Sequence, residues 1–312
     1  MKESDFLKWI YNQPAFSEKK VPVGPGDDMA IVNFKRDEML IACDQVIDSV
    51  HFKLETDGAY LAGRKAMARN LSDIAAMGAL PVAAVASAVL PADFSQQDAQ
   101  NLYNGMREMG QQFHCPLVGG DTASWGKTQG KLAISLTVIA CPAGATGKVK
   151  PILRSGARAN QIICVTGQLG GAWTTDKHLK FTPRVREGIL LAFRYKIKAM
   201  MDISDGLARD LGRICEASGT GAELYADAIP ISPNAGRPGV TPLQSALTDG
   251  EDYELLFTVP RGQAQAVTSD KYIPVPVTQI GKIIREPGLF LVYPDGTREE
   301  ITKLGWDHTT EN

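Results

Sequence analysis

Aspartates in this chain stand beside glycines or at the ends of apolar runs, in both halves of the sequence. They occur at 26–28 (GDD), at Asp44 and Asp48, at Asp73, at 119–122 (GGDT), at 202–206 (DISDG) and at 250–252 (GED). Glycine lets a ligand come close to the backbone, whereas clustered carboxylates repel one another unless cations lie between them. Carboxylate oxygens favour Mg²⁺, Mn²⁺ or Ca²⁺ over zinc, and protein-bound magnesium commonly also binds phosphates. The pattern therefore indicates a metal-dependent enzyme that acts on phosphates.

Each of these aspartates also has a purely structural interpretation. Asp is common at turns and helix N-caps because its side chain accepts hydrogen bonds from the nearby backbone. Asp205 fits an N-cap of the helix that follows it, and Asp28 and Asp252 fit turns. The recurrence of aspartate with glycine in both halves of the chain is what favours a shared ligand site.

The common nucleotide and metal signatures are absent from the sequence. Residues 120–128 (GDTASWGKT) resemble a phosphate-binding loop, but five residues separate the two glycines where four are required, and an apolar strand-like run follows instead of a helix. There is no GxGxxG, no HRD or DFG of a protein kinase, and no HExxH among the four histidines. The five cysteines are scattered without a CxxC pair, which predicts reduced thiols.

Composition and charge limit the classes of partner. Lys and Arg number 33 and Asp and Glu 35, which gives a formal net charge of -2. No basic excess therefore indicates binding to nucleic acid or to an anionic membrane. No apolar run approaches the ~20 residues of a membrane helix, and the N-terminus lacks the apolar core of a signal peptide. For a chain of 312 residues we expect a cytoplasmic protein of two domains, with no nucleic-acid or membrane partner.

Short β-rich runs and helical segments are mixed in the first half, which predicts an α+β organisation. We expect strands at 29–34, 39–46, 82–90 and 131–141, and helices at 57–77 and 95–113. The second of these helices begins with a sequence like a capping box, 95–98 (SQQD). Gly78 follows the first helix as a C′ glycine, and 142–147 (PAGATG) is typical of a linker.

The second half is expected to form an α/β unit. One helix is predicted at 183–199, with Thr182 as N-cap and Pro183 at N1, and another from about 205 to just before Gly219. Expected strands lie at 161–166, 222–224, 253–259, 278–284 and 289–293. A hairpin turn is predicted at 294–296 (PDG).

Eight motifs, taken together and in this order, are similar to those of thiamine-monophosphate kinases. They are 26–28 (GDD), Asp44 with 50–52 (VHF), 70–79 (NLSDIAAMGA) with Pro81, 119–122 (GGDT), 154–157 (RSGA), 165–167 (VTG), 202–207 (DISDGL) and 250–255 (GEDYEL). The blocks at 70–81 and 250–255 are highly specific. The family belongs to the aminoimidazole ribonucleotide synthetase-like superfamily, and the resemblance extends over nearly the whole chain.

The resemblance implies a fold and an activity. The fold would be α/β (α+β), of the two-domain PurM-like type. Residues 1–145 would form an N-terminal ATP- and metal-binding domain whose mixed sheet pairs in a homodimer, and residues 146–312 a C-terminal α/β domain. The activity would be ATP-dependent phosphorylation of thiamine monophosphate to thiamine diphosphate, with several Mg²⁺ ions.

The motif match also implies roles for single residues. Magnesium ligands would be Asp27, Asp44, Asp73, Asp121, Asp202 and Asp205. Metal-assisted catalysis, with no general base, would depend on Asp44, Asp121 and Asp205. Contacts to ATP would come from Tyr103, Gly120, Asp121, Arg154 and Ser204. Contacts to thiamine phosphate would come from His51, Glu251 and Trp306, the last in 305–308 (GWDH).

Two segments depart from the family pattern. Ala42 and Cys43 stand where family members usually have hydroxyl residues, directly before Asp44. A neutral thiol is a poor magnesium ligand, so backbone carbonyls would have to serve there. The segment 168–182 is shorter than usual, because the family carries a longer helical segment at this place. This second departure lies on the acceptor side of the expected site.

The expected chemistry is direct transfer between two anions. ATP and a phosphate monoester enter an acidic site only with divalent ions between carboxylates and phosphates, and the transfer would then be in line. Two alternatives stay open. One is another ATP-dependent enzyme of the superfamily, although the extended N-terminal glycine-rich loop that such enzymes often have is not visible here. The other is a nucleotide-binding module without catalysis, which the intact set of aspartates argues against.

Overall fold

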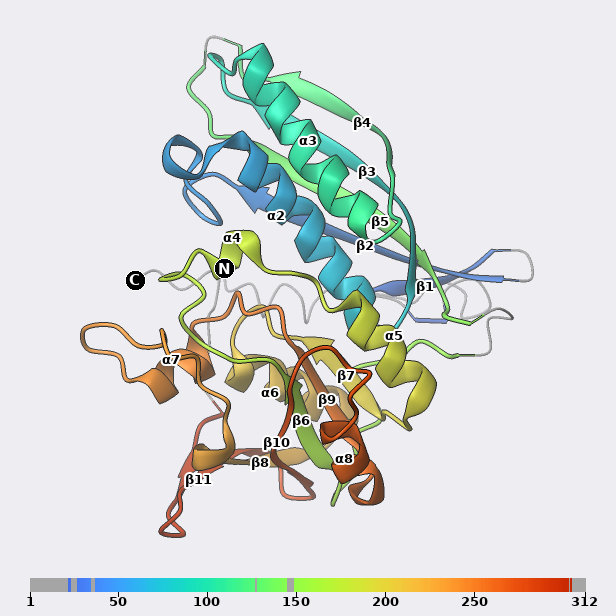
Figure 1. Ribbon diagram of the computed structural model, residues 1–312, viewed down its shortest axis with the longest axis vertical. Helices are drawn as coiled ribbons and strands as arrows, with labels where there is room; N and C mark the ends of the chain where they lie inside the picture. Colours follow the sequence, from blue (N-terminus) through green and yellow to red (C-terminus); the bar gives the residue numbers. More distant parts are fainter. Residues whose placement is uncertain are drawn as a thin grey trace.

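Two β-sheets, each with its own helices, build the protein (Figure 1). The computed structural model describes residues 22–23, 27–34, 37–126, 128–144, 149–302 and 304. A five-stranded sheet lies in the first half of the chain and a seven-stranded sheet in the second. The predicted α+β organisation of the first half and α/β unit of the second are both observed.

The first sheet has the strand order β1-β2-β5-β3-β4. Its strands are β1 (Ala30–Phe34), β2 (Asp37–Ile47), β3 (Leu80–Leu90), β4 (Leu117–Ser124) and β5 (Ala133–Cys141). Only β3 and β4 run parallel, and the other neighbours are antiparallel. Side chains of β5 alternate strictly between buried and half-buried, because one face of the sheet is covered and the other is open.

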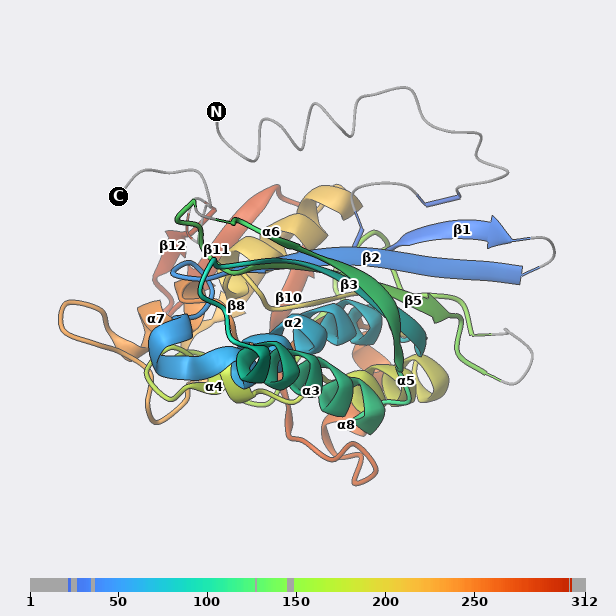
Figure 2. The ribbon, with the colours of Figure 1, turned by 90° about the horizontal axis from the view of Figure 1, so that it is seen from above.

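Two helices cover the same face of this sheet, as Figure 2 shows. They are α2 (Leu54–Ala76) and α3 (Gln96–Gln112). Ser95 caps α3 by accepting the N–H of Asp98, as the sequence predicts. Helix α2 begins three residues earlier than expected, but non-helical backbone at Gly58 (φ 77°) interrupts its first turn.

The second sheet has the strand order β12-β11-β8-β10-β6-β9-β7. Its strands are β6 (Ile162–Thr166), β7 (Ala199–Asp202), β8 (Gly221–Tyr225), β9 (Leu255–Val259), β10 (Val277–Ile284), β11 (Gly288–Val292) and β12 (Arg298–Glu300). Its helices are α4 (Lys177–Lys180), α5 (Val185–Arg194), α6 (Leu207–Ser218), η1 (Ala226–Ala228), α7 (Pro242–Thr248) and α8 (Arg261–Thr268). The predicted turn at 294–296 joins β11 and β12, which pair antiparallel.

The predicted helix at 183–199 is wrong at both ends. Helix α5 begins after Arg184, which forms no side-chain cap, and ends at Arg194. The last predicted helical residue, Ala199, instead begins strand β7, whose four residues are all buried. A short apolar run that is buried on both faces has no period that distinguishes strand from helix.

Strand β4 was not predicted either, since its exposed residues and two glycines carry no apolar alternation. It is an edge strand, paired only with β3 in the first sheet. Gly120 is required there, because a Cβ at this position would overlap the carbonyl oxygen of Ala86 on β3.

Helix α2 connects the two halves of the molecule. It contacts α4, α5 and β7 of the second half, and one hydrophobic cluster runs from Ile74 and Met77 to Met200 and Phe257. The backbones of α2 and α5 touch, because a Cβ on Gly188 would overlap the carbonyl oxygen of Ala75. The residues of α2 are therefore held at fixed positions relative to the second sheet.

Among the described residues, every helix is too short or too polar to cross a membrane. All five cysteines are free thiols, as the sequence predicts. The predicted domain boundary between 145 and 146 falls outside the described residues and remains a prediction.

Candidate active site

Three carboxylates from distant parts of the chain meet between the two sheets. Asp28 precedes β1, Asp73 lies on α2, and Asp202 is the last residue of β7. One oxygen of each lies within 4.8 Å of the others. Asp73 and Asp202 are predicted magnesium ligands, and Asp28, which the sequence analysis treats as a turn residue, is the third member. We call these three residues the carboxylate triad.

The triad is short of positive charge. Burial, and then the charge of Asp28, raises the pKa of Asp202 to about 8. Burial, and then the charges of Asp44 and Asp202, raises the pKa of Asp73 well above its ordinary value. Carboxyl groups with such values hold protons near neutral pH unless a cation replaces them. Three hard oxygen donors that cannot all ionise alone fit a divalent cation such as Mg²⁺.

Arg154 partly compensates the triad. Its guanidinium donates to both oxygens of Asp28, with Nε–Oδ2 at 3.1 Å and Nη2–Oδ1 at 3.0 Å. Its backbone N–H donates to the carboxylate of Asp27 at 3.1 and 3.3 Å. Burial, and then the charge of Asp28, raises the pKa of Asp27 to about 6. Asp27 thus lies beside the triad, while its oxygens accept backbone hydrogen bonds.

Asp44 belongs to the helix-facing side of β2. Its backbone N–H donates to Oδ1 of Asn70 at 3.2 Å, and its carboxylate accepts from Nε of Arg69 at 3.2 Å. Asn70 and Asp73 are one turn apart on α2, as expected from their spacing. Since the charge of Asp44 raises the pKa of Asp73, Asp44 acts on the triad electrostatically.

Ser204 and Asp205 lie at the start of α6. Their backbone N–H groups both donate to Oδ2 of Asp210 at 3.0 Å. Asp205 pairs with Nη2 of Arg213 at 2.5 Å. The N-cap interpretation of Asp205 is wrong, because Gly206 (φ 106°) occupies that position and no side chain caps the helix. The carboxylate of Asp205 instead forms the ion pair with Arg213.

The predicted nucleotide contacts of the first half are not gathered at the triad. Gly120 is paired with Ala86, Ala86 with Leu136, and Leu136 with Asp44 on successive neighbouring strands. Gly120 and Asp44 are therefore separated by three strand spacings, or ~14 Å. Asp121 is exposed one residue further on, so it points to the open face of the sheet while Asp44 points to the helices. Tyr103 is 47% exposed on α3.

The predicted acceptor contacts His51 and Glu251 are both buried and both meet Lys65. The Nζ atom of Lys65 lies 2.6 Å from Oε2 of Glu251 and donates to the carbonyl oxygen of His51 at 2.7 Å. Nδ1 of His51 accepts the N–H of Ile47, so in the neutral ring the proton is on Nε2. Trp306 lies outside the described residues.

The loop that carries Glu251 has an uncommon backbone. Gly250, Glu251 and Tyr253 have φ of 69°, 59° and 50°, and such conformations in residues other than glycine occur mostly where a site requires them. The ring of Tyr253 stacks on Phe181 at 3.9 Å between centroids. Its hydroxyl is buried without a hydrogen-bond partner among the described residues. Arg69, Glu251 and Asp44 are among the charged groups that act on it.

Sequence reasoning missed Asp28, Lys65, Arg69 and Tyr253. For Asp28 a signal was available, because the doublet Asp27-Asp28 offers two carboxylates and the motif match assigned only Asp27 to the metal. Lys65 and Arg69 lie in an alanine-rich part of α2, where basic residues usually indicate a solvated helix face. Only the packing of α2 between the two sheets reveals that Lys65 is buried and that Arg69 is largely covered.

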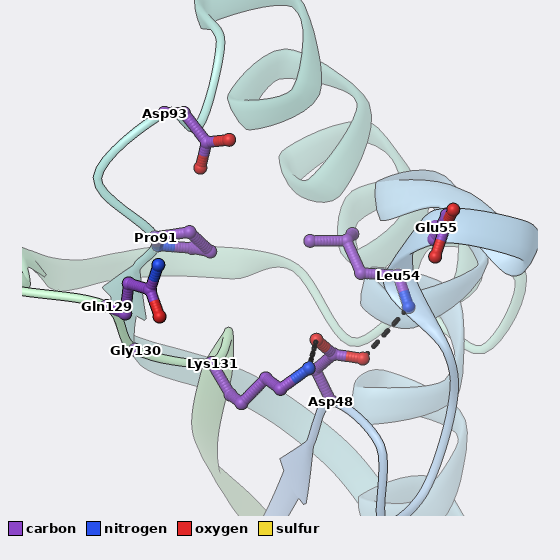
Figure 3. Close-up of a pocket in the computed structure, with 8 residues that line it drawn as sticks. All are labelled: Asp48, Leu54, Glu55, Pro91, Asp93, Gln129, Gly130 and Lys131. Atoms are coloured by element: carbon purple, nitrogen blue, oxygen red, sulfur yellow. Dashed lines mark hydrogen bonds and ion pairs between the residues drawn. The ribbon is translucent and has the colours of Figure 1, made fainter.

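An open pocket of about 560 Å³ lies at the other end of α2 (Figure 3). Its lining includes Asp48, Glu55, Asp93 and Lys131. The carboxylate of Asp48 accepts the N–H of Leu54 at 3.0 Å and lies 3.6 Å from Nζ of Lys131. None of the residues with a predicted ligand role lines this pocket.

Comparisons with known proteins agree over nearly the whole length of the chain. Residues 26–141 match the AIR synthase related protein, N-terminal domain, and residues 160–294 match the AIR synthase related protein, C-terminal domain. The solved structure of AaThiL complexed with AMPPCP and TMP superposes with a TM-score of 0.81 at 26% identity, covering 98% of this chain and 97% of that one. The predicted two-domain PurM-like fold is thereby confirmed.

Two curated proteins identify the family. The thiamine-monophosphate kinase of Rhodopirellula baltica is 36% identical over 318 residues, which cover 98% of this chain and 97% of that protein. The thiamine-monophosphate kinase of Bacillus subtilis is 32% identical and covers 92% of this chain and 94% of its own length. With full-length similarity and buried aspartates at the matching motifs, the chain belongs to the thiamine-monophosphate kinase family.

Proposed function

We propose that this protein transfers the γ-phosphoryl group of ATP to thiamine monophosphate and so produces thiamine diphosphate. The observation that carries the proposal is the carboxylate triad, a buried acidic site formed by motif residues of a chain that belongs to this family. The reaction would take place in the cytosol, where ATP is available.

Magnesium is part of the proposal. Asp28, Asp73 and Asp202 would hold one ion, since their oxygens are close enough to share it. The matched residues Asp27, Asp44 and Asp205 would hold further ions near the phosphates, whereas Asp121, on the open face of the first sheet, would hold an ion at the boundary between two copies. When bound, magnesium neutralises phosphate charge and orients the phosphoryl group for in-line transfer.

The residues of the chain would bind and orient the two substrates. The guanidinium of Arg154, held by Asp28, offers donors to phosphate oxygens. His51 and Glu251 would hold the acceptor, with Trp306 as a further contact. The acceptor atom is a phosphate oxygen that is largely ionised near neutral pH, so a general base is not needed.

A homodimer formed through the first sheet is the proposed assembly. The open face of that sheet lies opposite α2 and α3 (Figure 2), and Val85 on it is 40% exposed. Val118 on the edge strand β4 is 64% exposed. Pairing of two such faces would cover these apolar groups. It would also place Asp121 and Gly120 at the boundary between two copies, where the nucleotide would bind.

The two other candidate functions make different predictions for the same assay. ADP formation and thiamine diphosphate formation are measured with ATP and Mg²⁺, in the presence of thiamine monophosphate, thiamine or no acceptor. The proposal requires both products in equal amounts, and only with thiamine monophosphate. ADP that appears without thiamine diphosphate indicates another ATP-dependent enzyme of the superfamily. Nucleotide binding without ADP formation indicates a module that has lost catalysis.

A further inference from the structure

Lys65 is a fully buried lysine at the centre of α2. Its ammonium group lies 2.6 Å from Oε2 of Glu251, donates to the carbonyl oxygen of His51 at 2.7 Å, and lies 5.2 Å from the centre of the Trp173 ring. These contacts provide an anion, a neutral acceptor and an aromatic face. The three partners are therefore arranged around one charge.

The partners come from three separate segments. His51 belongs to the loop between β2 and α2, Glu251 to the strained loop between α7 and β9, and Trp173 to the segment between β6 and α4. In the described residues, Lys65 is the ion-pair partner of Glu251, whose Oε2 has no other hydrogen-bond partner there. One side chain thus connects the loop of the first sheet to two loops of the second.

A buried ion pair adds little net stability, because removing both charges from water costs about as much as their attraction returns. Replacing it with apolar side chains is often neutral or stabilising. A role in geometry is therefore the better explanation for Lys65. The residues that it joins are the two acceptor contacts of the described chain, and neither the triad nor Arg154 contacts it directly.

Trp173 adds an aromatic wall beside these contacts. It is 43% exposed, and its ring stacks on His178 at 4.3 Å between centroids. His178 is itself fixed, since its Nδ1 lies 3.1 Å from the carbonyl oxygen of Ala172. The indole of Trp173 is thus held by His178 while part of its surface stays exposed. That exposed surface can stack on a flat or cationic heteroaromatic ring of a ligand.

We propose that Lys65 is the positioning residue of the acceptor site: it holds Glu251 and the His51 loop in register and fixes the indole of Trp173 beside them. This inference rests on the proposed function, because it concerns the acceptor of that reaction. Lys65 contacts neither phosphate that reacts. It controls how tightly thiamine monophosphate binds, and the binding of ATP is independent of it.

The central test compares Lys65→Met with the wild-type protein. The expected result is a KM for thiamine monophosphate that rises roughly tenfold or more, with the KM for ATP nearly unchanged. Lys65→Arg keeps the charge and should restore part of the acceptor affinity. Lys282→Met is the matched control, since it removes another lysine–glutamate pair, to Glu223 at 2.9 Å, on the far sheet.

A double-variant cycle shows whether Lys65 acts through Glu251. On a Glu251→Gln background, Lys65→Met should raise the acceptor KM by clearly less than it does in the wild-type protein, because one of the partners that Lys65 positions has already lost its charge. This pair of variants also replaces the single one if Lys65→Met alone fails to fold, since it leaves no unpaired buried charge. An additive effect in the cycle would overturn the proposal.

The pH profile provides a second readout. Burial lowers the pKa of Lys65 to about 8, and the carboxylate of Glu251 opposes this shift. Arg69 and Asp57 also act on the ammonium group electrostatically, and the charge of Lys65 in turn lowers the pKa of His178. The acceptor KM should therefore rise as the pH passes 8, and this rise should be absent in Lys65→Met.

Two outcomes separate the proposals from each other. If the wild-type protein makes no thiamine diphosphate, the proposed function fails. If it does, and Lys65→Met leaves the acceptor KM unchanged, only the role of Lys65 fails. An equal rise of both KM values would show a general structural effect and would also overturn that role.

Discussion

Ser72 on α2 donates a 2.5 Å hydrogen bond to the carboxylate of Asp202 at the end of β7. The neighbour of Ser72 on the helix is Asp73, so adjacent residues of α2 provide one member of the triad and fix another. This bond crosses between the two halves of the protein, and the geometry of the triad depends on it.

Ser72→Ala should weaken both the fold and the metal site. The hydrogen bond from Ser72 lowers the pKa of Asp202 against the effect of burial, so its loss makes that carboxyl harder to ionise. We expect a loss of about 1–3 kcal/mol in the free energy of unfolding and a weaker response to Mg²⁺. Melting curves with and without Mg²⁺ measure both. Ser87→Ala, on the open face of β3, is the control, and equal behaviour of the two variants would contradict the prediction.

Asp44→Asn should abolish phosphoryl transfer and leave the fold intact. Its carboxylate lies beside the triad and pairs with Arg69, so the variant removes one charge from the proposed metal and phosphate site. The variant should raise the activation free energy of phosphoryl transfer by several kcal/mol. Turnover at low magnesium, with circular dichroism as the fold control, is the measurement. Near-wild-type turnover would exclude Asp44 as a central ligand.

Protons and magnesium should compete at the triad. The pKa values of Asp202, about 8, and Asp27, about 6, lie above the ordinary 3.8. The folded protein therefore binds these protons more tightly than the unfolded chain does. These bound protons stabilise the fold fully when the pH is below the pKa of the carboxyl groups in the unfolded chain. The stabilisation is lost as the pH rises through their higher pKa values in the folded protein. Without metal, the melting temperature should fall between pH 5 and about 8.

Magnesium should reverse this loss, because bound cations replace the protons. The rise in melting temperature on adding Mg²⁺ should therefore grow from pH 6 to about 8. Titrations at several pH values test this, and Asp202→Asn should make the response weaker and flatter. A magnesium response that is independent of pH in the wild-type protein would contradict the protonated state of the triad.

Tyr253→Phe should leave the ligand-free protein as stable as before, or more stable by about 1 kcal/mol. The hydroxyl of Tyr253 is buried and has no hydrogen-bond partner in the part of the chain that the structure describes, and phenylalanine keeps the stacking on Phe181. Tyr195→Phe is the matched comparison, because the hydroxyl of Tyr195 donates to Asp270 at 2.7 Å. Its removal should lower the free energy of unfolding. Chemical denaturation of both variants measures the difference. A clear loss of stability in Tyr253→Phe would mean that the hydroxyl has a partner in solution.

Cys43→Ser should retain activity. The thiol of Cys43 is 3.2 Å from the hydroxyl of Ser135 on β5. It lies on the open face of the sheet, whereas the next residue, Asp44, points to the helices. A hydroxyl restores the oxygen that family members usually have there and is a better neighbour for magnesium. Steady-state kinetics over a range of magnesium concentrations test this, and an inactive variant would reveal a role for the thiol.

Local signals predicted much of the fold, and tertiary contacts explain the misses. Helix α3 was predicted almost to the residue because Ser95 and Asp98 cap it within one turn. Strand β7 was missed because its burial on all sides leaves no period in the sequence. For the site, the motifs indicated Asp73 and Asp202. The inclusion of Asp28 depends on how the segment before β1 lies against α2 and β7, and no local pattern encodes that.

The burial of Lys65 also could not be predicted from the sequence. A lysine in a helix is usually solvated, and the sequence around it gives no sign that the helix is covered on both sides. Its burial follows from α2 lying between the first sheet and the elements α4, α5 and β7. Residues of this kind can be recognised only once the two halves are assembled.

The close contact between helices α2 and α3 fixes their position along each other. A Cβ on Gly63 would overlap the carbonyl oxygen of Leu102, and one on Gly105 would overlap that of Tyr60, so the two backbones touch and cannot slide past each other. Tyr103 follows Leu102 in this contact, and Asp73 lies ten residues beyond Gly63 along α2, or ~15 Å at 1.5 Å per residue. Backbone contact therefore fixes the distance between the exposed ring of Tyr103 on α3 and the carboxylate of Asp73 on α2. A methyl group added at either glycine would force the two backbones apart, since the added carbon would lie only 2.1 Å (Gly63) or 2.0 Å (Gly105) from a backbone oxygen of the other helix, and the helix that carries Asp73 would move with it.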